Sequence, residues 1–321
     1  MAVYTSVSDE QLADFLAQYD LGEAVAFKGI AEGVENSNYY LETTTGRYIL
    51  TLFEKRTNPD DLPYFIALKQ HLSGNGFSCP LPVSGRDGSA LRSLATRPAV
   101  IISFLQGLSP RVPNAVQCRE LGIGLAQLHA ASADFAQVRE NDLGPDSWPR
   151  LWDGRARTAD ALQPDLAEKI DADLEAVLAD PSLTKNLPTG TIHADLFPDN
   201  AFFLGNRFTG AIDFYFACTD ALAYDLAVCI NAWAFEPDGA FNYSKATNLI
   251  AGYESIRALE ATEKEAFAIL CRGAALRFFL TRLVDWTETP ADALVKPKDP
   301  LDYAKRLRFH RTARSIADYG G

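Results

Sequence analysis

The stretch from Gly190 to Phe214, GTIHADLFPDNAFFLGNRFTGAIDF, constrains the fold more than any other part of the chain. It places one of the chain's four histidines next to an aspartate, then an asparagine, and it ends in another aspartate. Two short apolar runs meet at Gly205-Asn206, which is typical of a β-hairpin. The fold must therefore bring a polar loop and both ends of a hairpin to one place.

The hairpin determines which polar side chains meet. If Asn206-Arg207 is a two-residue turn, Asn200 and Asp213 lie opposite each other on neighbouring strands. Asp195 lies in the short loop that leads to Asn200, so three oxygen-bearing side chains are expected to converge. A few hard oxygen ligands suit Mg²⁺, which takes its other ligands from water and phosphates. One carboxylate then stays free to accept a proton from an attacking hydroxyl.

Other interpretations of this stretch fit less well. A zinc site would need more histidine or cysteine nearby, and an EF-hand loop would need a glycine and a terminal glutamate that the stretch lacks. The remaining alternative is that Pro198-Asp-Asn is a plain turn and Asp213 a strand end. The full pattern, His-x-Asp-x-x-x-x-Asn followed by a later Asp, has instead the division of labour of a protein-kinase catalytic loop.

Three further polar residues are candidates for support of this loop. His193 is placed with the catalytic residues, but we expect it to brace the loop, because the neighbouring Asp195 already suits proton transfer. Asp225, in AYDLAVCINAW, would by default cap a helix, and we expect it to support the catalytic loop. His129 lies on a predicted helix and is expected to be a hydrogen-bonded core residue.

The chain divides into a sheet-rich first part and a helical second part. Strand-like runs are EAVAFKGIA, NSNYYLETTTG and RYILTLFEKR, with a further apolar run from Ala99 to Leu105. After Gly107 helical spacing dominates, with helices expected near 157–179, 243–257, 262–286 and 300–318 and one embedded hairpin. We therefore predict an α+β, protein-kinase-like two-lobe fold. Its N-terminal antiparallel-sheet lobe spans residues 1–105 and its larger, mostly helical C-terminal lobe spans residues 106–321.

Composition narrows the possible partners. The formal net charge of −12 argues against nucleic-acid binding and against a polybasic membrane anchor. Five scattered cysteines without a C-x-x-C pair indicate reduced, buried thiols. The N-terminal sequence has no signal-peptide pattern, and no apolar run reaches membrane-spanning length. We expect a cytoplasmic protein that acts on a small molecule; the sequence does not determine its oligomeric state.

Together these motifs resemble the aminoglycoside phosphotransferase and choline kinase branch of the protein-kinase-like fold. The chain is more closely similar to the kinase-like homoserine kinases of bacteria, through the stretches GVENSNYYLETTTGRYILTLFEKR, HADLFPDN, IDFYFAC and YDLAVCINAW. These stretches lie in both predicted lobes, so the resemblance covers most of the chain. It implies transfer of the γ-phosphoryl group of ATP to the side-chain hydroxyl of L-homoserine, a step of threonine biosynthesis.

The resemblance also implies residue roles. Asp195 would be the catalytic base, and Asn200 with Asp213 would hold Mg²⁺. The residues implied to bind ATP are Gly33, Asn36, Ser37, Asn38, Ser103 and Leu105. The residues implied to shape the substrate pocket are Tyr215, Asn231 and Trp233. Candidates to pair with the carboxylate of an amino-acid substrate are Arg277 and Arg282.

Two departures from the protein-kinase pattern leave alternatives open. The chain lacks Gly-x-Gly-x-x-Gly, and in YILTL Thr51 occupies the position of the phosphate-binding lysine. The nearest cations by sequence are Lys28, Lys55 and Arg56. One alternative is a related kinase that acts on choline, methylthioribose or an aminoglycoside. The other is a catalytically inactive, nucleotide-binding regulatory protein.

Overall fold

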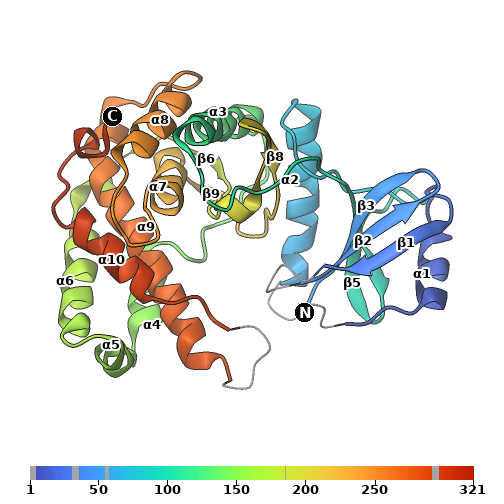
Figure 1. The fold of residues 1–321 in the computed structure, drawn as a ribbon, viewed down its shortest axis with the longest axis horizontal. Helices are drawn as coiled ribbons and strands as arrows, with labels where there is room; N and C mark the ends of the chain where they lie inside the picture. The colour runs from blue at the N-terminus through green and yellow to red at the C-terminus, as the bar shows by residue number, and fades with distance from the viewer. Residues whose placement is uncertain (1–4, 31–35, 55–57, 185, 291–295) are drawn as a thin grey trace. The chain divides into compact units, whose positions relative to one another are not determined.

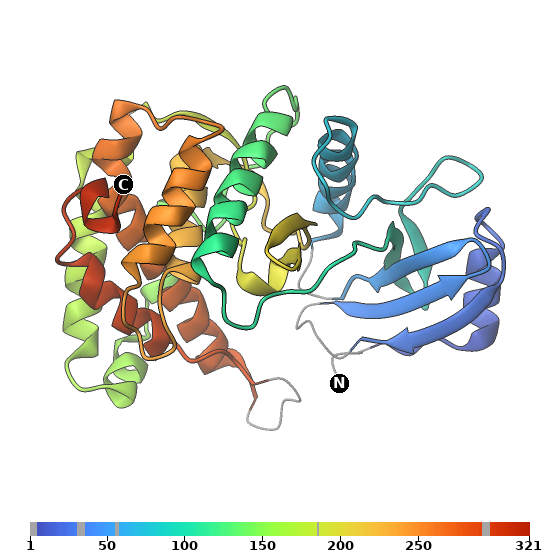
Figure 2. The same cartoon turned by 45° about the horizontal axis from the view of Figure 1, so that its top comes forward.

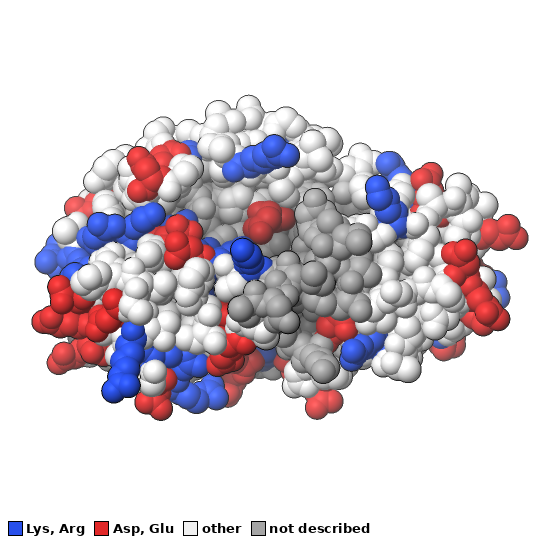
Figure 3. Space-filling view, turned by 60° about the horizontal axis from the view of Figure 1, so that its bottom comes forward, with Lys and Arg blue, Asp and Glu red and all other residues white. Residues whose placement is uncertain are grey.

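The computed structural model of this 321-residue chain describes residues 5–30, 36–54, 58–184, 186–290 and 296–321. The chain forms two compact units, Met1–Gln106 and Gly107–Gly321, whose elements are labelled in Figure 1. On the face drawn in Figure 3, acidic and basic side chains are interspersed. Within the described ranges, no helix is both long enough and apolar enough to cross a membrane.

The first unit is built on an antiparallel five-stranded sheet with the strand order β1-β2-β3-β5-β4. The strands are β1 (Ala24–Gly29), β2 (Ser37–Thr43), β3 (Gly46–Leu52), β4 (Arg92–Leu94) and β5 (Arg97–Ser103). Side chains of β2 alternate between buried and partly exposed, as expected of a strand with one face on a core. The predicted turn at TTTG joins β2 to β3, with Thr43 paired to Gly46.

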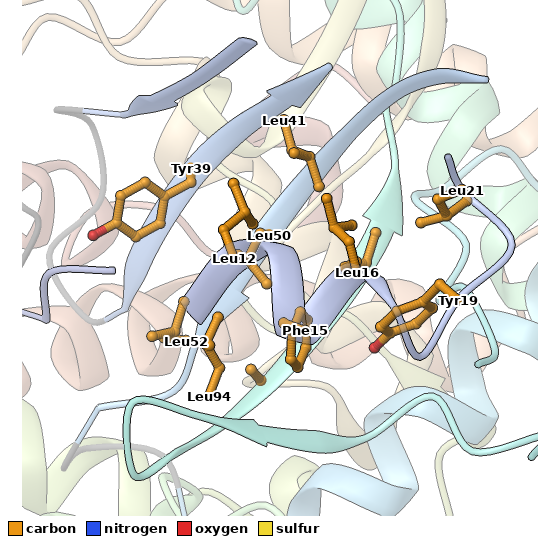
Figure 4. Packing of buried hydrophobic residues seen from close by; sticks show 12 residues of the cluster. Leu12, Phe15, Leu16, Tyr19, Leu21, Tyr39, Leu41, Leu50, Leu52 and Leu94 are labelled. Carbon is orange, nitrogen blue, oxygen red and sulfur yellow. The ribbon is translucent and has the colours of Figure 1, made fainter. Parts of the chain in front are cut away.

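Helix α1 (Asp9–Leu16) covers one face of this sheet, as Figure 4 shows. Ser8 and Gln11 form the capping box that the sequence predicts at its start. The apolar face of α1 packs on leucines of β2 and β3, in a cluster of Leu12, Phe15, Leu16, Leu41, Leu50 and Leu52. Helix α2 (Leu62–Gly74) lies on the other side of the sheet (Figures 1 and 2).

The second unit is mostly helical. Its α-helices are α3 (Ala115–Ala131), α4 (Trp148–Trp152), α5 (Ala156–Leu162), α6 (Leu166–Leu178), α7 (Leu222–Trp233), α8 (Tyr243–Glu254), α9 (Ala261–Glu288) and α10 (Leu301–His310). Helix α7 is buried around most of its circumference and packs against α3, α8 and α9. A helix that is apolar on all sides belongs in a core. Helix α7 can therefore hold the polar side chains that it carries in fixed positions.

Helices α3 and α8 approach closely because each presents a glycine to the other. A Cβ atom on Gly122 would lie 2.1 Å from the carbonyl oxygen of Leu249, and one on Gly252 would lie 2.1 Å from that of Arg119. Only glycine permits such backbone proximity. The contact fixes α3, which carries His129.

Two small antiparallel sheets interrupt the helices. Strands β7 (Ala201–Leu204) and β8 (Arg207–Ala211) form the predicted hairpin, and β6 (Thr189–Ile192) pairs with β9 (Cys218–Ala221). The β6–β9 pair was missed from the sequence, because strands of only four residues carry little periodic signal. The helix predicted over 157–179 is two helices with a break at 163–165, and the helix predicted over 300–318 ends at His310.

Candidate functional site

The loop between β6 and β7 brings Asp195 and Asn200 into contact. The Nδ2 atom of Asn200 donates to the main-chain carbonyl of Asp195 at 2.8 Å and to its Oδ2 atom at 3.2 Å. Asp195 is only partly buried. These bonds use the amide nitrogen, so the amide oxygen of Asn200 is turned away from the Asp195 carboxylate.

The hairpin brings Asp213 to the same loop, but in a register different from the predicted one. Leu204 pairs with Arg207, so the turn lies one residue earlier than predicted, and β8 contains a bulge at Thr209. The predicted pairing of Asn200 with Asp213 is therefore wrong. Instead the Ile212 N–H donates to the Asn200 carbonyl at 2.9 Å. Asp213 follows directly, is exposed, and still lies at the same end of the hairpin as Asn200.

The backbone has an unusual conformation at both edges of this site. Ala194 and Asp213 each have φ of 61°, in the left-handed region that side chains other than glycine disfavour. Such residues persist only where the surroundings hold them, and they cluster at functional sites. Ala194 is held at both of its polar atoms, since its N–H donates to Asp225 and its carbonyl accepts from Arg277.

Asp225, on the buried helix α7, supports the loop. It accepts the N–H groups of His193 at 2.7 Å and Ala194 at 2.9 Å, and Nε2 of His129 lies at 3.1 Å. Burial alone would raise the pKa of Asp225, but the bonds to the two histidines outweigh it and the net pKa is lowered. The supporting position expected of Asp225 is confirmed. The capping alternative is wrong, because the N-cap of α7 is Ala221.

His193 ties the loop to the hairpin. It is fully buried, its Nε2 donates to the Ile212 carbonyl at 2.9 Å, and its Nδ1 accepts the Asp195 N–H at 3.3 Å. Burial lowers the pKa of the His193 ring, which favours the neutral form that this bonding requires. These are the contacts of a bracing residue.

His129 lies behind Asp225. Its Nδ1 is 2.8 Å from the Tyr253 hydroxyl, and its Nε2 contacts the Asp225 carboxylate. Both ring nitrogens are therefore satisfied within the core. The prediction that His129 is a hydrogen-bonded core residue is confirmed.

Arg277, on α9, is the cation behind Asp195. It is buried, its Nη1 donates to the Ala194 carbonyl at 2.9 Å, and its guanidinium lies 4.1 Å from the Phe278 ring centre. Loss of water raises the pKa of Asp195 to about 8, Arg277 opposes that rise, and the charge of Asp213 adds to it. Arg277 therefore both positions the loop and biases the Asp195 carboxyl toward its ionised form.

Arg282, the other arginine considered for a substrate carboxylate, has acidic and main-chain partners of its own. Its Nη1 donates to the Asp299 carbonyl at 3.0 Å and to the Asp302 carboxylate at 3.2 Å. Its guanidinium also lies 4.7 Å from the Tyr303 ring centre. These contacts attach α9 to the start of α10.

The residues implied for the substrate pocket lie in different surroundings. Asn231 is fully buried; its amide donates to main-chain carbonyls of α7 and α9 and accepts from His310. These contacts join three helices and lend no support to a substrate role for Asn231. Trp233 is buried and donates to the Leu196 carbonyl at 2.8 Å, so it supports the loop from below. Tyr215 is half-buried, and burial raises the pKa of its hydroxyl.

Lys298 was missed from the sequence. Its Nζ lies 3.7 Å from the Asp199 carboxylate and 5.4 Å from the Phe197 ring centre. It also counteracts the upward shift in the pKa of Asp195. No local pattern marks this lysine, because only tertiary folding brings it to the loop.

In the first unit, the residues implied for phosphate binding join β2 to the end of β3. Ser37 donates to the Glu54 carboxylate at 2.7 Å, and Asn36 accepts the Glu54 N–H at 3.2 Å. Asn38 accepts the Thr51 hydroxyl at 2.8 Å. Residues implied or considered in this region that lie outside the described ranges are Gly33, Lys55 and Arg56.

The remaining residues of the first unit are placed by its sheet. Thr51, at the position of the kinase lysine, is 2% exposed and pairs with Val100 of β5. Lys28 is exposed on β1. Ser103 ends β5 and exchanges two hydrogen bonds with Leu81, at 2.9 and 2.8 Å. Leu105 follows the strand and is half-buried.

The described side chains also show whether a metal-binding cluster is present. In the part of the chain that the structure describes, no group of three or more His, Cys, Asp or Glu side chains is arranged to hold a metal. A zinc-type cluster is therefore absent there. The oxygen-bearing side chains at the end of the hairpin remain the candidate ligands.

Comparison with known proteins identifies the family. Residues 26–259 match the phosphotransferase enzyme family. The chain belongs to this family. A homoserine kinase of Hyphomonas neptunium is 67% identical over all of both chains. One of Methylobacterium radiotolerans is 58% identical over 100% of this chain and 99% of its own.

Solved structures confirm the predicted kinase-like α+β fold of this phosphotransferase. Spectinomycin phosphotransferase matches with a TM-score of 0.70 at 12% identity, over 98% of both chains. An aminoglycoside phosphotransferase from Alicyclobacillus acidocaldarius matches with a TM-score of 0.67 at 16% identity, over 95% of this chain and 93% of its own. At such low identity the likeness concerns the fold alone.

Proposed function

We propose that this phosphotransferase is a homoserine kinase, which converts L-homoserine and ATP to O-phospho-L-homoserine and ADP. The observation that carries the proposal is the relative of that name with 67% identity over all of both chains. A second full-length relative of the same name, at 58% identity, supports it. The reaction would serve threonine biosynthesis.

In this proposal Asp195 is the general base for the homoserine hydroxyl. Burial raises the pKa of Asp195 to about 8, and a base is most effective when its pKa lies near the working pH. The Asn200 amide and the bonds to Ala194 fix the position of Asp195. His193 would act on the reaction only through its bracing of this loop.

Asn200 and Asp213 would hold Mg²⁺. Their donor set fits the ion, because an amide oxygen and a carboxylate are hard oxygen ligands and phosphates complete the shell. The exposed position of Asp213 fits a ligand that is shared with a bound nucleotide. When bound, Mg²⁺ neutralises charge on the transferring phosphoryl group.

ATP would bind to the first unit, near the start of β2 and the end of β5. The residues proposed for this are Gly33, Asn36, Ser37, Asn38, Ser103 and Leu105. Side chains of Ser37 and Asn38 are bonded to Glu54 and Thr51, so in this proposal they act by holding the start of β2 in position. Two structures with the same fold contain adenine nucleotides: spectinomycin phosphotransferase with ADP, and amicoumacin kinase with AMP-PNP.

The proposed partner is L-homoserine, with no role for nucleic acid or a membrane. We place the reaction in the cytoplasm, where ATP is available. Support comes from the five cysteines, all free and buried, which suits a reducing compartment.

The test is Mg²⁺-dependent release of ADP from ATP with L-homoserine, D-homoserine, L-serine, choline, methylthioribose or kanamycin. We expect release with L-homoserine, reduced about 10²- to 10⁴-fold in Asp195→Asn because the general base is lost. Release with another alcohol instead would support a related small-molecule kinase. Retained ATP binding with no release across the panel would support the inactive regulatory protein.

A further inference from the structure

A cavity of about 310 Å³ lies in the helical unit, beside the loop that carries Asp195. The loop contributes Pro198, and helix α10 contributes three charged residues. The charged residues that line the cavity are Arg111, Glu236, Lys245, Asp302, Lys305 and Arg306. None of the roles assigned above uses this space.

Arg306 lines this cavity and is half-buried, and one of its donors is unpaired. Its Nη1 atom is buried, and no described residue accepts a hydrogen bond from it. The guanidinium is held between two rings, 4.3 Å from the centre of Tyr303 and 5.6 Å from that of Phe235. Native structures leave few buried donors without an acceptor, and a charged donor is the most costly to leave unpaired. The guanidinium of Arg306 is therefore a candidate partner for an acceptor group of a ligand in the cavity.

Tyr303 adds a second unpaired polar atom on the same face of α10. It precedes Arg306 by three residues, the spacing that places side chains next to each other on a helix. Its hydroxyl is buried and has no hydrogen-bond partner among the described residues. Burial raises the pKa of Tyr303, and the negative charge of Asp195 adds to the rise. This face of α10 is therefore within electrostatic reach of the proposed base.

The charges around the cavity fit a zwitterion. Lys245 and Glu236 pair with each other at 2.7 Å, whereas Arg306 has no carboxylate within ion-pair distance in the described ranges. An unpaired guanidinium suits a carboxylate, which it can bind with two parallel hydrogen bonds. Asp302, one turn before Arg306, also lines the cavity; one oxygen of its carboxylate accepts from Arg282 at 3.2 Å, and the other is a candidate partner for an ammonium group.

A second cavity of the same unit, about 240 Å³, provides a contrast. Its lining includes the basic residues Arg272, His310 and Arg314. Arg272 is bound to the buried Asp173 at 2.6 Å, and both ring nitrogens of His310 have partners. No lining residue of that cavity has a buried, unpartnered polar atom among those the structure describes. The unpaired donor thus distinguishes the cavity at α10.

We propose that the cavity at α10 binds the carboxylate of an amino acid through Arg306, and that this amino acid is the substrate L-homoserine. The inference rests on the proposed function and extends it to substrate specificity. Arg306 then separates an amino acid from an amino alcohol that has the same reactive hydroxyl but no carboxylate. Loss of one charged hydrogen bond of this kind corresponds to about 10- to 100-fold in kcat/KM.

The experiment compares Arg306→Gln and Arg306→Lys with the wild type. The matched control is Arg308→Gln, an exposed arginine on the same helix. Each protein is assayed with L-homoserine and with 3-aminopropan-1-ol, which keeps the hydroxyl and the amine but has no carboxylate. We expect Arg306→Gln to lower kcat/KM about 10- to 100-fold for L-homoserine and less than about 3-fold for the amino alcohol. KM for ATP should be unchanged in Arg306→Gln. All kinetic constants of the control Arg308→Gln should equal those of the wild type.

A second readout uses L-2-aminobutyrate, which keeps the carboxylate and the amine but has no hydroxyl to phosphorylate. It should compete with L-homoserine in the wild type, and calorimetry should show at least about 10-fold weaker binding to Arg306→Gln. Equal losses for both alcohols, or unchanged binding of L-2-aminobutyrate, would overturn the proposal. Arg306-dependent inhibition that is not competitive would also overturn it, by assigning the cavity to a separate effector.

These readouts separate the two proposals. Turnover of L-homoserine by the wild type decides the proposed function, whereas dependence of amino-acid binding on Arg306 decides the role of the cavity. Thermal unfolding of Arg306→Gln checks that the variant is folded. The Arg306→Lys variant keeps the charge but not the planar pair of donors, so it should fall between the wild type and Arg306→Gln.

Discussion

Two regions hold polar side chains in place by different means. One is the loop of residues 193–200 in the helical unit. The other is the open end of the β2–β3 hairpin in the sheet unit, where β2 begins and β3 ends, which we call the strand edge. In the loop, the supports come from distant helices: Asp225 on α7 and Arg277 on α9. At the strand edge, Ser37 and Asn38 bond to residues that are 17 and 13 positions away in the same hairpin. One site depends on the packing of a helical core, and the other depends on local strand register.

This difference determines how each region should respond to change. Ala194 of the loop has a left-handed backbone, and so does Asp213 at the end of the hairpin beside it. Only continued support from the surroundings keeps such residues in place. Loss of a support should therefore alter chemistry and stability together. At the strand edge, the backbone ladder persists when one side-chain bond is removed, so a single change should have a small and local effect.

The largest effect is expected from Asp225→Asn. An asparagine presents an NH₂ group to one of the N–H donors that the carboxylate accepts, so the loop must move and a buried network is broken. We expect kcat to fall about 100-fold and the free energy of unfolding to fall by about 3–5 kcal/mol. Steady-state kinetics and urea unfolding would measure these. The control is Asp238→Asn in an exposed loop; wild-type kcat in Asp225→Asn would mean that the loop does not need α7.

The next effect is expected from Arg277→Met. Arg277 opposes the rise in the pKa of Asp195, so its removal should move the acidic limb of the kcat profile to higher pH. We also expect kcat to fall about 10- to 100-fold, because the Ala194 carbonyl loses its partner and the loop shifts.

The matched control for Arg277→Met is Arg272→Met, on the same helix. Arg272 is paired with Asp173, away from the loop. It should lower stability without a shift in the pH profile. An unshifted profile in Arg277→Met would contradict the electrostatic role of Arg277.

The parts of the fold that sequence predicted correctly are those with a local, repeated signal. The capping box at Ser8, the strands around TTTG and the helices predicted over 243–257 and 262–286 follow from periodicity and end signals. The features that were missed lack such a signal. The β6–β9 pair joins two four-residue strands across an intervening hairpin, and the bulge in β8 changed the register by one residue, which no turn residue indicates.

The site shows the same limit. The short spacing from His193 to Asn200 lies within one loop, so sequence alone brought these residues together. Arg306 and Lys298 come near this loop only through the packing of α10 and of the segment before it. Nothing in their local sequence indicates that position. The substrate role implied for Asn231 lacks support for a related reason: the pattern showed its helix but not the partners of its amide.

A smaller effect, on stability, is expected from Asp195→Asn when the protein is measured without metal or nucleotide. The pKa of Asp195 in the folded protein is about 8, above the ordinary value of about 4. Folding therefore disfavours its ionised form, so the wild type loses stability relative to the variant as pH rises from about 4 to about 8. Because Asp195 is only partly buried, solvent screens its charge and only about 1 kcal/mol of this difference is expected. The melting temperature of the variant should therefore exceed that of the wild type by about 2–4 °C at pH 8 and match it at pH 4. A difference that is constant with pH would contradict the raised pKa.

The smallest effect is expected from Thr51→Val, at the strand edge. The change keeps the shape of the side chain but removes the hydrogen bond to Asn38, which should lower the free energy of unfolding by about 1 kcal/mol. KM for ATP should change less than about 3-fold, because the sheet holds Asn38 through the backbone pairing of β2 with β3. Thr43→Val, at the other end of β2, is the control. If Thr51→Val instead raised KM for ATP 10-fold or more, one side-chain bond would control the strand edge as strongly as Asp225 controls the loop, and the contrast between the two regions would fail.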